Sequence, residues 1–270
     1  FEAVEVIVSS EATGKILDFY IIEGQELAEN QIVGYIDSTQ LYLRKQQLII
    51  NAGTVDANKP EINKQIAALE HQIKTAKIEK QRIENLIKSE AANTKQLDDI
   101  NAQIILYEKQ LEAQKSNLKI NTRSITGESS ALEIQIAQLQ DQIDKCKIKS
   151  PIKGRVLVTY TEKGEFAATG KALFKIADTD NMILRAYITS EQLASIKTGN
   201  KVKVLADYGN DKTKEYLGEI IYISDKAEFT PKSILTDDER ASLVYAVKIA
   251  VKNDGYLKIG MSGYLEFENN

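Results

Sequence analysis

Two distant stretches of this chain carry the same pattern. Residues 14–37 read GKILDFYIIEGQELAENQIVGYID, and residues 154–177 read GRVLVTYTEKGEFAATGKALFKIA. Both contain short alternations of apolar and polar residues broken by glycine, which is typical of short strands joined by tight turns. A gap-free alignment matches Gly14 with Gly154, Ile16 with Val156, Tyr20 with Tyr160, Gly24 with Gly164, and Ile36 with Ile176. The shared spacing argues against chance recurrence and predicts one small β-sandwich made of two related halves.

The residues between the two copies have a different period. Apolar side chains from Ile62 to Ile87, from Leu97 to Leu118 and from Leu132 to Cys146 recur in steps of four and three, with Lys80 and Gln114 as exceptions. This spacing is typical of helices that pack along a narrow seam. Both ends of the insertion must return to one β-domain. The pattern therefore predicts a long antiparallel α-helical coiled-coil hairpin over 38–147, with its tip near 90–94 and arms of roughly 75–80 Å.

Two polar segments interrupt the seam. Residues 51–60 include Gly53 and Pro60, and residues 121–130 include Gly127 with several serines and threonines. The two segments lie at similar distances from the expected tip, so we predict breaks near 51–60 and near 121–130 that form a shared joint. Two unrelated loops are the alternative. Cys146 is in step with the seam and is expected to be a packed side chain, whereas His71 lies between seam positions and is expected in solvent.

The C-terminal third again has the character of β-structure. Residues 179–270 contain several short apolar alternations, the clearest at 243–251, and one short helix is expected at 190–196 with Ser190 as its N-cap. This pattern predicts a C-terminal small β-barrel. The fold class is thus multidomain α+β, with a sandwich formed by 1–37 and 148–178, a hairpin over 38–147 and a barrel over 179–270.

Composition excludes several classes of function. The net charge is −4 and no stretch concentrates Lys and Arg with aromatic residues, so no nucleic-acid partner is expected. One cysteine and one histidine leave no material for a disulfide, a multi-cysteine metal site or a histidine-based triad. No catalytic, cofactor or metal residues are predicted. The sequence begins at Phe1 without a spanning apolar run, so we expect that an anchoring N-terminal segment is missing from it.

The split repeat resembles the lipoyl or biotinyl-carrier domain, a barrel-sandwich hybrid of two related halves. In carrier proteins the modified lysine lies on the hairpin that joins the halves. Here residues 38–147 take that place, without a Glu-x-Met-Lys-Met or Asp-Lys-Ala motif. The resemblance thus implies a split lipoyl-like fold without the carrier chemistry. A carrier protein stays open as an alternative, as does a coiled-coil tether that has no role in transport.

The arrangement as a whole is similar to HlyD-type membrane fusion proteins, whose hairpin tip carries Arg, Leu, a small turn and Asp. The matching stretch RIENLIKSEAANTKQLDDI supplies Arg82, Leu86, Ala91, Ala92, Asn93 and Asp98, with Asn93 where the family usually has Ser. Residues 229–249 and the closing GMSGYL also resemble the family's barrel. The alternative for the tip residues is that they only stabilise the hairpin turn.

The resemblance implies a non-enzymatic periplasmic adaptor that is held at the inner membrane. Its tip would dock on a TolC-type outer-membrane channel. Its barrel would lie near an inner-membrane transporter, with an ABC-type transporter favoured. By family analogy the adaptor would form a homo-oligomer of six copies and would bind no cofactor.

Overall fold

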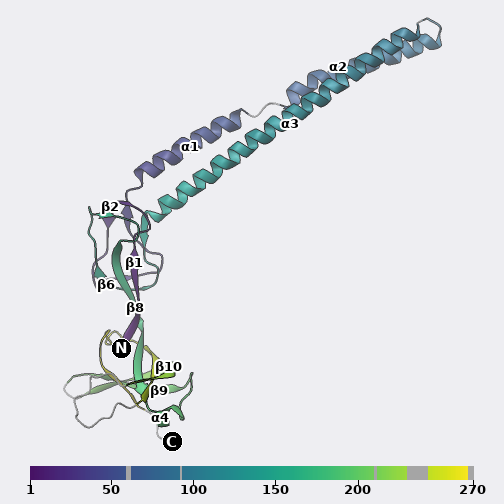
Figure 1. The fold of residues 1–270 in the computed structure, drawn as a ribbon. Coiled ribbons are helices and arrows are strands. Elements are labelled where there is room, and N and C mark those ends of the chain that lie inside the picture. Colours follow the sequence, from purple (N-terminus) through teal and green to yellow (C-terminus); the bar gives the residue numbers. More distant parts are fainter. Residues whose placement is uncertain (59–61, 92, 210–211, 230–242, 267–270) are drawn as a thin grey trace. The chain divides into compact units, whose positions relative to one another are not determined.

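The computed structural model describes residues 1–58, 62–91, 93–209, 212–229 and 243–266 (Figure 1). The chain divides into two compact units. One consists of Phe1–Ser38 together with Lys145–Asn270, and the other of Thr39–Asp144. The first unit contains all the β-strands and the second contains the long helices.

The two sequence copies form equivalent strands. In the first copy these are β2 (Gly14–Phe19), β3 (Glu26–Leu27) and β4 (Ile32–Ile36). In the second copy they are β6 (Gly154–Thr159), β7 (Phe166–Ala167) and the start of β8 (Ala172–Ile188). One sheet has the order β5-β4-β2-β7, where β5 is Lys147–Lys149, so strands of both copies lie in it. In the larger sheet β3 pairs with β6, β6 with β8, and β1 (Glu2–Ser9) with β8.

The halves interlock through reciprocal backbone hydrogen bonds. The Gly24 amide donates to the Val156 carbonyl at 2.8 Å, and the Gly164 amide donates to the Ile16 carbonyl at 2.9 Å. Gly24 and Gly164 have φ angles of 83° and 93°, which glycine adopts without steric cost. Ile16 and Val156 are fully buried. The predicted repeat is therefore confirmed as a barrel-sandwich hybrid made of two related halves.

The C-terminal strands extend the larger sheet. They are β9 (Lys201–Asp207), β10 (Thr213–Phe229), β11 (Leu243–Lys252) and β12 (Gly263–Glu266), and they continue it in the order β12-β9-β10-β11-β8. Val247, Ile249 and Val251 on β11 are buried in the core of this part, as their alternation predicts. Closure of these strands into a small barrel stays a prediction.

Strand β8 belongs to both parts of the β unit. Along one edge β1 pairs with residues 172–183, and along the other the partner changes from β6 at residues 174–177 to β11 at residues 181–188. The helix that follows, α4, covers Ser190–Leu193, and Thr189 is its N-cap. Ser190 was expected at that position, and the expectation is wrong because Thr189 and Gln192 bond reciprocally in a capping box.

The helical unit contains α1 (Thr39–Ala57), α2 (Ile62–Lys88) and α3 (Thr94–Lys145). The described seam side chains are buried or half-buried, with the deepest at Ile73, Ala76, Ile104, Leu118 and Leu139. His71 is exposed as expected, and Cys146 is buried directly after the end of α3. Within the described residues, no helix is both long enough and apolar enough to cross a bilayer.

Polar contacts between the arms share one antiparallel register. Lys77 pairs with Glu108 at 2.7 Å, and Lys115 pairs with Glu70 at 3.0 Å. A step of seven residues forward along α2 thus matches seven residues backward along α3. Lys45 of α1 donates to Gln140 of α3 at 2.6 Å. The antiparallel register of the α2–α3 pairs, continued back along the chain, also places Lys45 opposite Gln140. The residues on both sides of the gap between α1 and α2 therefore follow one register.

The predicted break at 121–130 is wrong, because α3 is continuous from Thr94 to Lys145. In a helix interior, glycine costs about 1 kcal/mol relative to alanine, and serine and threonine cost less, so one long helix tolerates them. Proline costs about 3 kcal/mol and also disfavours helix at the residue before it. Accordingly, the first arm is divided into α1, which ends before Pro60, and α2, which begins after it.

Replacing Gly127 by Ala tests the continuity of α3. An added Cβ meets no atom within 4 Å, so the substitution removes only the backbone flexibility of glycine. We expect Gly127→Ala to stabilise the helical unit by about 0.5–1 kcal/mol in urea unfolding followed by circular dichroism at 222 nm. Gly53→Ala in α1 is the matched control and should have a similar effect. A loss of stability in Gly127→Ala would instead support a break in the helix.

Candidate docking site at the hairpin tip

The turn at the tip begins with a specific C-cap of α2. The Glu90 amide donates to the Ile87 carbonyl at 3.0 Å, and the Ala91 amide donates to the Leu86 carbonyl at 2.8 Å. These two bonds form a Schellman motif, which satisfies carbonyls at the end of the helix. The motif needs a left-handed residue, and Glu90 takes that position with φ of 57°. A non-glycine residue there is strained.

Asn93 begins the returning helix. Its Oδ1 accepts the Gln96 amide at 3.1 Å, so Asn93 caps the N-terminus of α3. Ala92 also belongs to the predicted docking set, but it lies outside the described residues.

The other predicted docking residues lie on the surface around this turn. Leu86 is 40% exposed, and Ala91, Asn93 and Asp98 are also exposed. The Arg82 side chain is 74% exposed, and its closest carboxylate is Glu79 at 3.8 Å, a surface pair of little energetic value. Among the described residues, no ion pair joins Arg82 to Asp98.

The side chains at the tip therefore divide into two groups. Glu90 and Asn93 shape the turn, and Ser89 assists them by donating its hydroxyl to the Leu86 carbonyl at 2.9 Å. Arg82 and Asp98 make no recorded side-chain bond to the turn within the described residues, so their conformations are not required for it. An exposed leucine between charged and short polar side chains can contact a protein partner but offers no chemistry for catalysis.

Sequence reasoning missed Glu90 as a turn-forming residue. The usual signal for a left-handed C-cap is glycine or asparagine, and SEAAN has neither at that position. The resemblance placed Asn93 in the docking set, and the structure shows that Asn93 also caps α3.

Comparison with known proteins places this architecture in a family. A family model described as "RND MFP, barrel-sandwich hybrid domain" matches residues 4–179. The fold and this match define the chain as a membrane fusion protein. It belongs to the RND membrane fusion protein family.

Curated relatives match part of the chain. A UPF0194 membrane protein of Yersinia enterocolitica serotype O:8 is 36% identical over 119 residues, which is 44% of this chain and 36% of the relative. A UPF0194 membrane protein of Yersinia pseudotuberculosis serotype O:3 is 35% identical over 130 residues, which is 48% of this chain and 38% of the relative. The matched part of this chain thus spans less than two fifths of the length of these relatives.

Solved structures of low sequence identity share the fold. MacA from Actinobacillus actinomycetemcomitans has a TM-score of 0.56 at 20% identity, covering 98% of this chain and 74% of that one. The membrane fusion protein Spr0693 from Streptococcus pneumoniae R6 has a TM-score of 0.53 at 16% identity, covering 98% of each chain.

The strained Glu90 yields a prediction about stability. Glu90→Gly should stabilise the helical unit by about 0.5–1 kcal/mol, because glycine adopts a positive φ without a steric cost. Gln81→Gly, at an exposed position inside α2, is the control and should destabilise it by about 1 kcal/mol. Urea unfolding followed at 222 nm compares the two variants. Similar destabilisation by both substitutions would contradict the assigned Schellman motif.

The N-cap yields a second prediction. Asn93→Ala should destabilise the helical unit by about 1 kcal/mol, because the Gln96 amide then loses its side-chain acceptor. Asn93→Ser should retain most of the stability, since a serine hydroxyl can accept the same bond. The comparison again uses urea unfolding at 222 nm. Equal stability of the alanine and serine variants would show that the cap contributes nothing.

Proposed function

We propose that this chain is the periplasmic adaptor of a bacterial export system and links an inner-membrane transporter to an outer-membrane channel. Membership of the RND membrane fusion protein family supports this proposal. The observation that carries it is a long helical hairpin, inserted between the halves of the sandwich, with exposed side chains at its tip. Exposed apolar and charged side chains at the end of the insertion favour a docking role over a purely structural coiled-coil tether.

The hairpin tip is the proposed contact with a TolC-type channel. The docking set is Arg82, Leu86, Ala91, Ala92, Asn93 and Asp98. Leu86 would supply the apolar contact, and Arg82 and Asp98 would supply directional charged contacts on either side of it. Ala91 and Asn93 have short side chains, which would allow partner helices to approach closely.

The β unit is the proposed contact with the transporter. In this proposal its C-terminal strands form the small barrel, and six copies of the adaptor associate around the export path in the periplasm, anchored at the inner membrane. The tip sequence supports a relationship to HlyD-type members, and an ABC-type transporter is the partner favoured from the sequence. The RND description of the matching family supports a proton-driven pump instead. Capture of the transporter by crosslinking from the β unit would decide between the two pump classes.

Leu86→Asp tests the docking site in cells. With a photo-crosslinking residue at Asn93, the parent protein should capture an outer-membrane channel. Leu86→Asp should reduce capture roughly tenfold or more, because a charge replaces the apolar centre of the contact. Mass spectrometry of the captured protein and an export assay provide the two measurements.

Leu106→Asp is the matched control for this experiment. Leu106 is 54% exposed on α3 away from the turn, so the same change there should leave capture at the tip intact. Normal capture by Leu86→Asp, or an equal loss in both variants, would contradict docking through the tip.

A further inference from the structure

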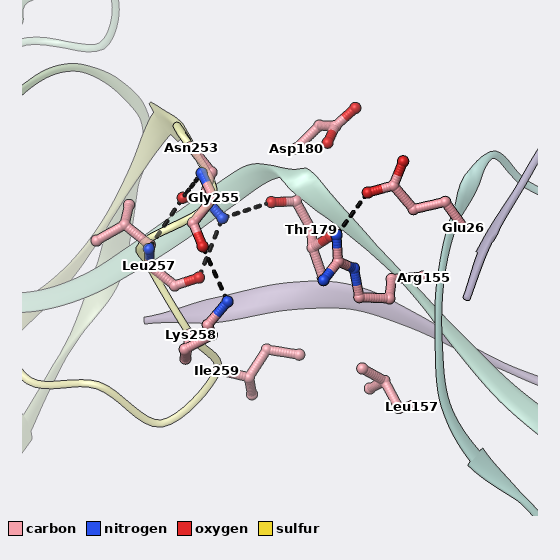
Figure 2. Close-up of a pocket in the computed structure, with 10 residues that line it drawn as sticks. All are labelled: Glu26, Arg155, Leu157, Thr179, Asp180, Asn253, Gly255, Leu257, Lys258 and Ile259. Atoms are coloured by element: carbon pink, nitrogen blue, oxygen red, sulfur yellow. Dashed lines mark hydrogen bonds and ion pairs between the residues drawn. The ribbon is translucent and has the colours of Figure 1, made fainter. Parts of the chain in front are cut away.

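A cavity of about 300 Å³ lies in the β unit where β8 changes partners. Its walls come from β3, β6, β8 and the segment between β11 and β12, as Figure 2 shows. Leu157, Leu257 and Ile259 supply apolar surface, and Arg155 and Lys258 supply positive charge. A mainly apolar cavity of this size with a few polar groups has the properties of a site for a small ligand.

Arg155 has donors that the protein does not use. Its Nη2 donates to Glu26 at 2.5 Å across the β3–β6 pair. Its Nε is shielded from solvent and has no acceptor among the described residues. A guanidinium has five N–H donors, and a shielded donor without an acceptor is costly. The side chain as a whole is 41% exposed, so an incoming oxygen could bind the solvent-accessible N–H donors that Glu26 does not use, although not Nε itself.

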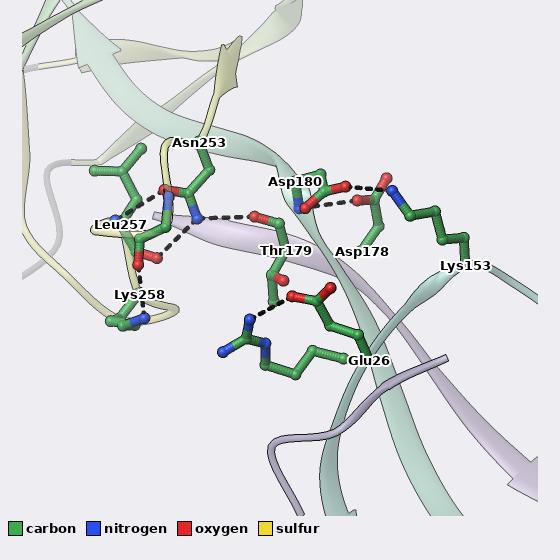
Figure 3. A network of polar contacts seen from close by, with 10 residues as sticks. Glu26, Lys153, Asp178, Thr179, Asp180, Asn253, Leu257 and Lys258 are labelled. Carbon is green, nitrogen blue, oxygen red and sulfur yellow. Dashed lines mark hydrogen bonds and ion pairs between the residues drawn. The ribbon is translucent and has the colours of Figure 1, made fainter. Parts of the chain in front are cut away.

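Among the charged side chains that line the cavity, Lys258 is the one without an oppositely charged partner in the described part of the chain. The Asp180 carboxylate accepts a hydrogen bond from Lys153 at 2.8 Å, which with neighbouring cations holds the pKa of Asp180 below its ordinary value (Figure 3). Glu26 is paired with Arg155. Lys258 donates to the Gly255 carbonyl at 2.9 Å, and within the described residues no carboxylate pairs with it. The two acidic groups are thus neutralised, while the Lys258 ammonium is not.

Asn253 holds the cavity wall in place. Its Nδ2 donates to the carbonyls of Thr179 and Leu257 at 2.8 and 3.0 Å, and its Oδ1 accepts the amides of Gly255 and Leu257 at 2.9 Å each. Both polar atoms of this side chain are therefore fully used. The segment that carries Lys258 and Ile259 is fastened to β8 before any ligand arrives, so little ordering is required on binding.

We propose that this cavity binds a small amphiphilic carboxylate. Arg155 and Lys258 hold the carboxylate oxygens, and Leu157 and Ile259 contact the alkyl part. The bound molecule bridges β6 and the segment after β11, on either side of the point where β8 changes partners. It thereby restrains the two parts of the β unit relative to each other. The site is independent of the docking site in the hairpin and of the proposed role as an adaptor.

Octanoate titration of the isotope-labelled 270-residue chain tests this site. Amide shifts should be concentrated at residues 253–259 and around Arg155. 1-Octanol, which lacks the charge, and acetate, which lacks the alkyl part, should each bind at least tenfold more weakly than octanoate. Absence of octanoate binding, or equal binding of octanol, would overturn the proposal.

Substitutions locate the head-group contacts. Arg155→Met should weaken octanoate binding roughly tenfold or more, since a charged hydrogen bond is lost. Lys258→Met should also weaken octanoate binding. It breaks no ion pair among the described residues, so it tests the site even if Arg155→Met fails to fold. Arg185→Met is the matched control, because Arg185 likewise pairs with a glutamate, Glu228, but does not line the cavity. Unchanged binding in Lys258→Met, or an equal loss in Arg185→Met, would refute the assignment.

Discussion

The interlocking of the two halves of the sandwich is the constraint on which the rest of the chain depends. Gly24 and Gly164 each donate to the strand of the other half, so neither half completes its hydrogen bonding alone. The same pairing brings β4 beside β5, and the Ile36 amide donates to the Cys146 carbonyl at 2.8 Å. The two ends of the insertion are thus held together, and a helical insertion with adjacent ends must fold back on itself.

Within the hairpin, the buried apolar seam sets the register, and polar contacts between the arms follow it. Buried Ile73, Ile104 and Leu118 provide the packing, and the pairs from Lys45 to Gln140 and from Lys77 to Glu108 share one offset. α1 and α2 thus face α3 in the same antiparallel register. The location of the turn therefore follows from the register along the whole hairpin.

At the tip, the turn does not use every side chain around it. The backbone of Leu86 and the conformation of Glu90 close the turn, whereas the side chains of Arg82 and Asp98 remain in solvent. Substitution of Arg82 or Asp98 would therefore leave the hydrogen bonds of the turn in place. The β unit shows a similar division, because Asn253 fixes the cavity wall, whereas the Lys258 ammonium bonds only to the Gly255 carbonyl among the described residues.

The sequence by itself determined the repeat and the helical seam, because each depends on the spacing of apolar residues and glycines along the chain. It overestimated the effect of Gly127, since the cost of one glycine is small beside the stability of a 52-residue helix. Only the tertiary structure decided the strained turn at Glu90 and the cavity beside Arg155. The turn at Glu90 lacks the glycine that usually indicates a left-handed residue, and the cavity lies between strands that are more than 100 residues apart in the chain. Local patterns specify elements, whereas strain and cavities arise from the way those elements meet.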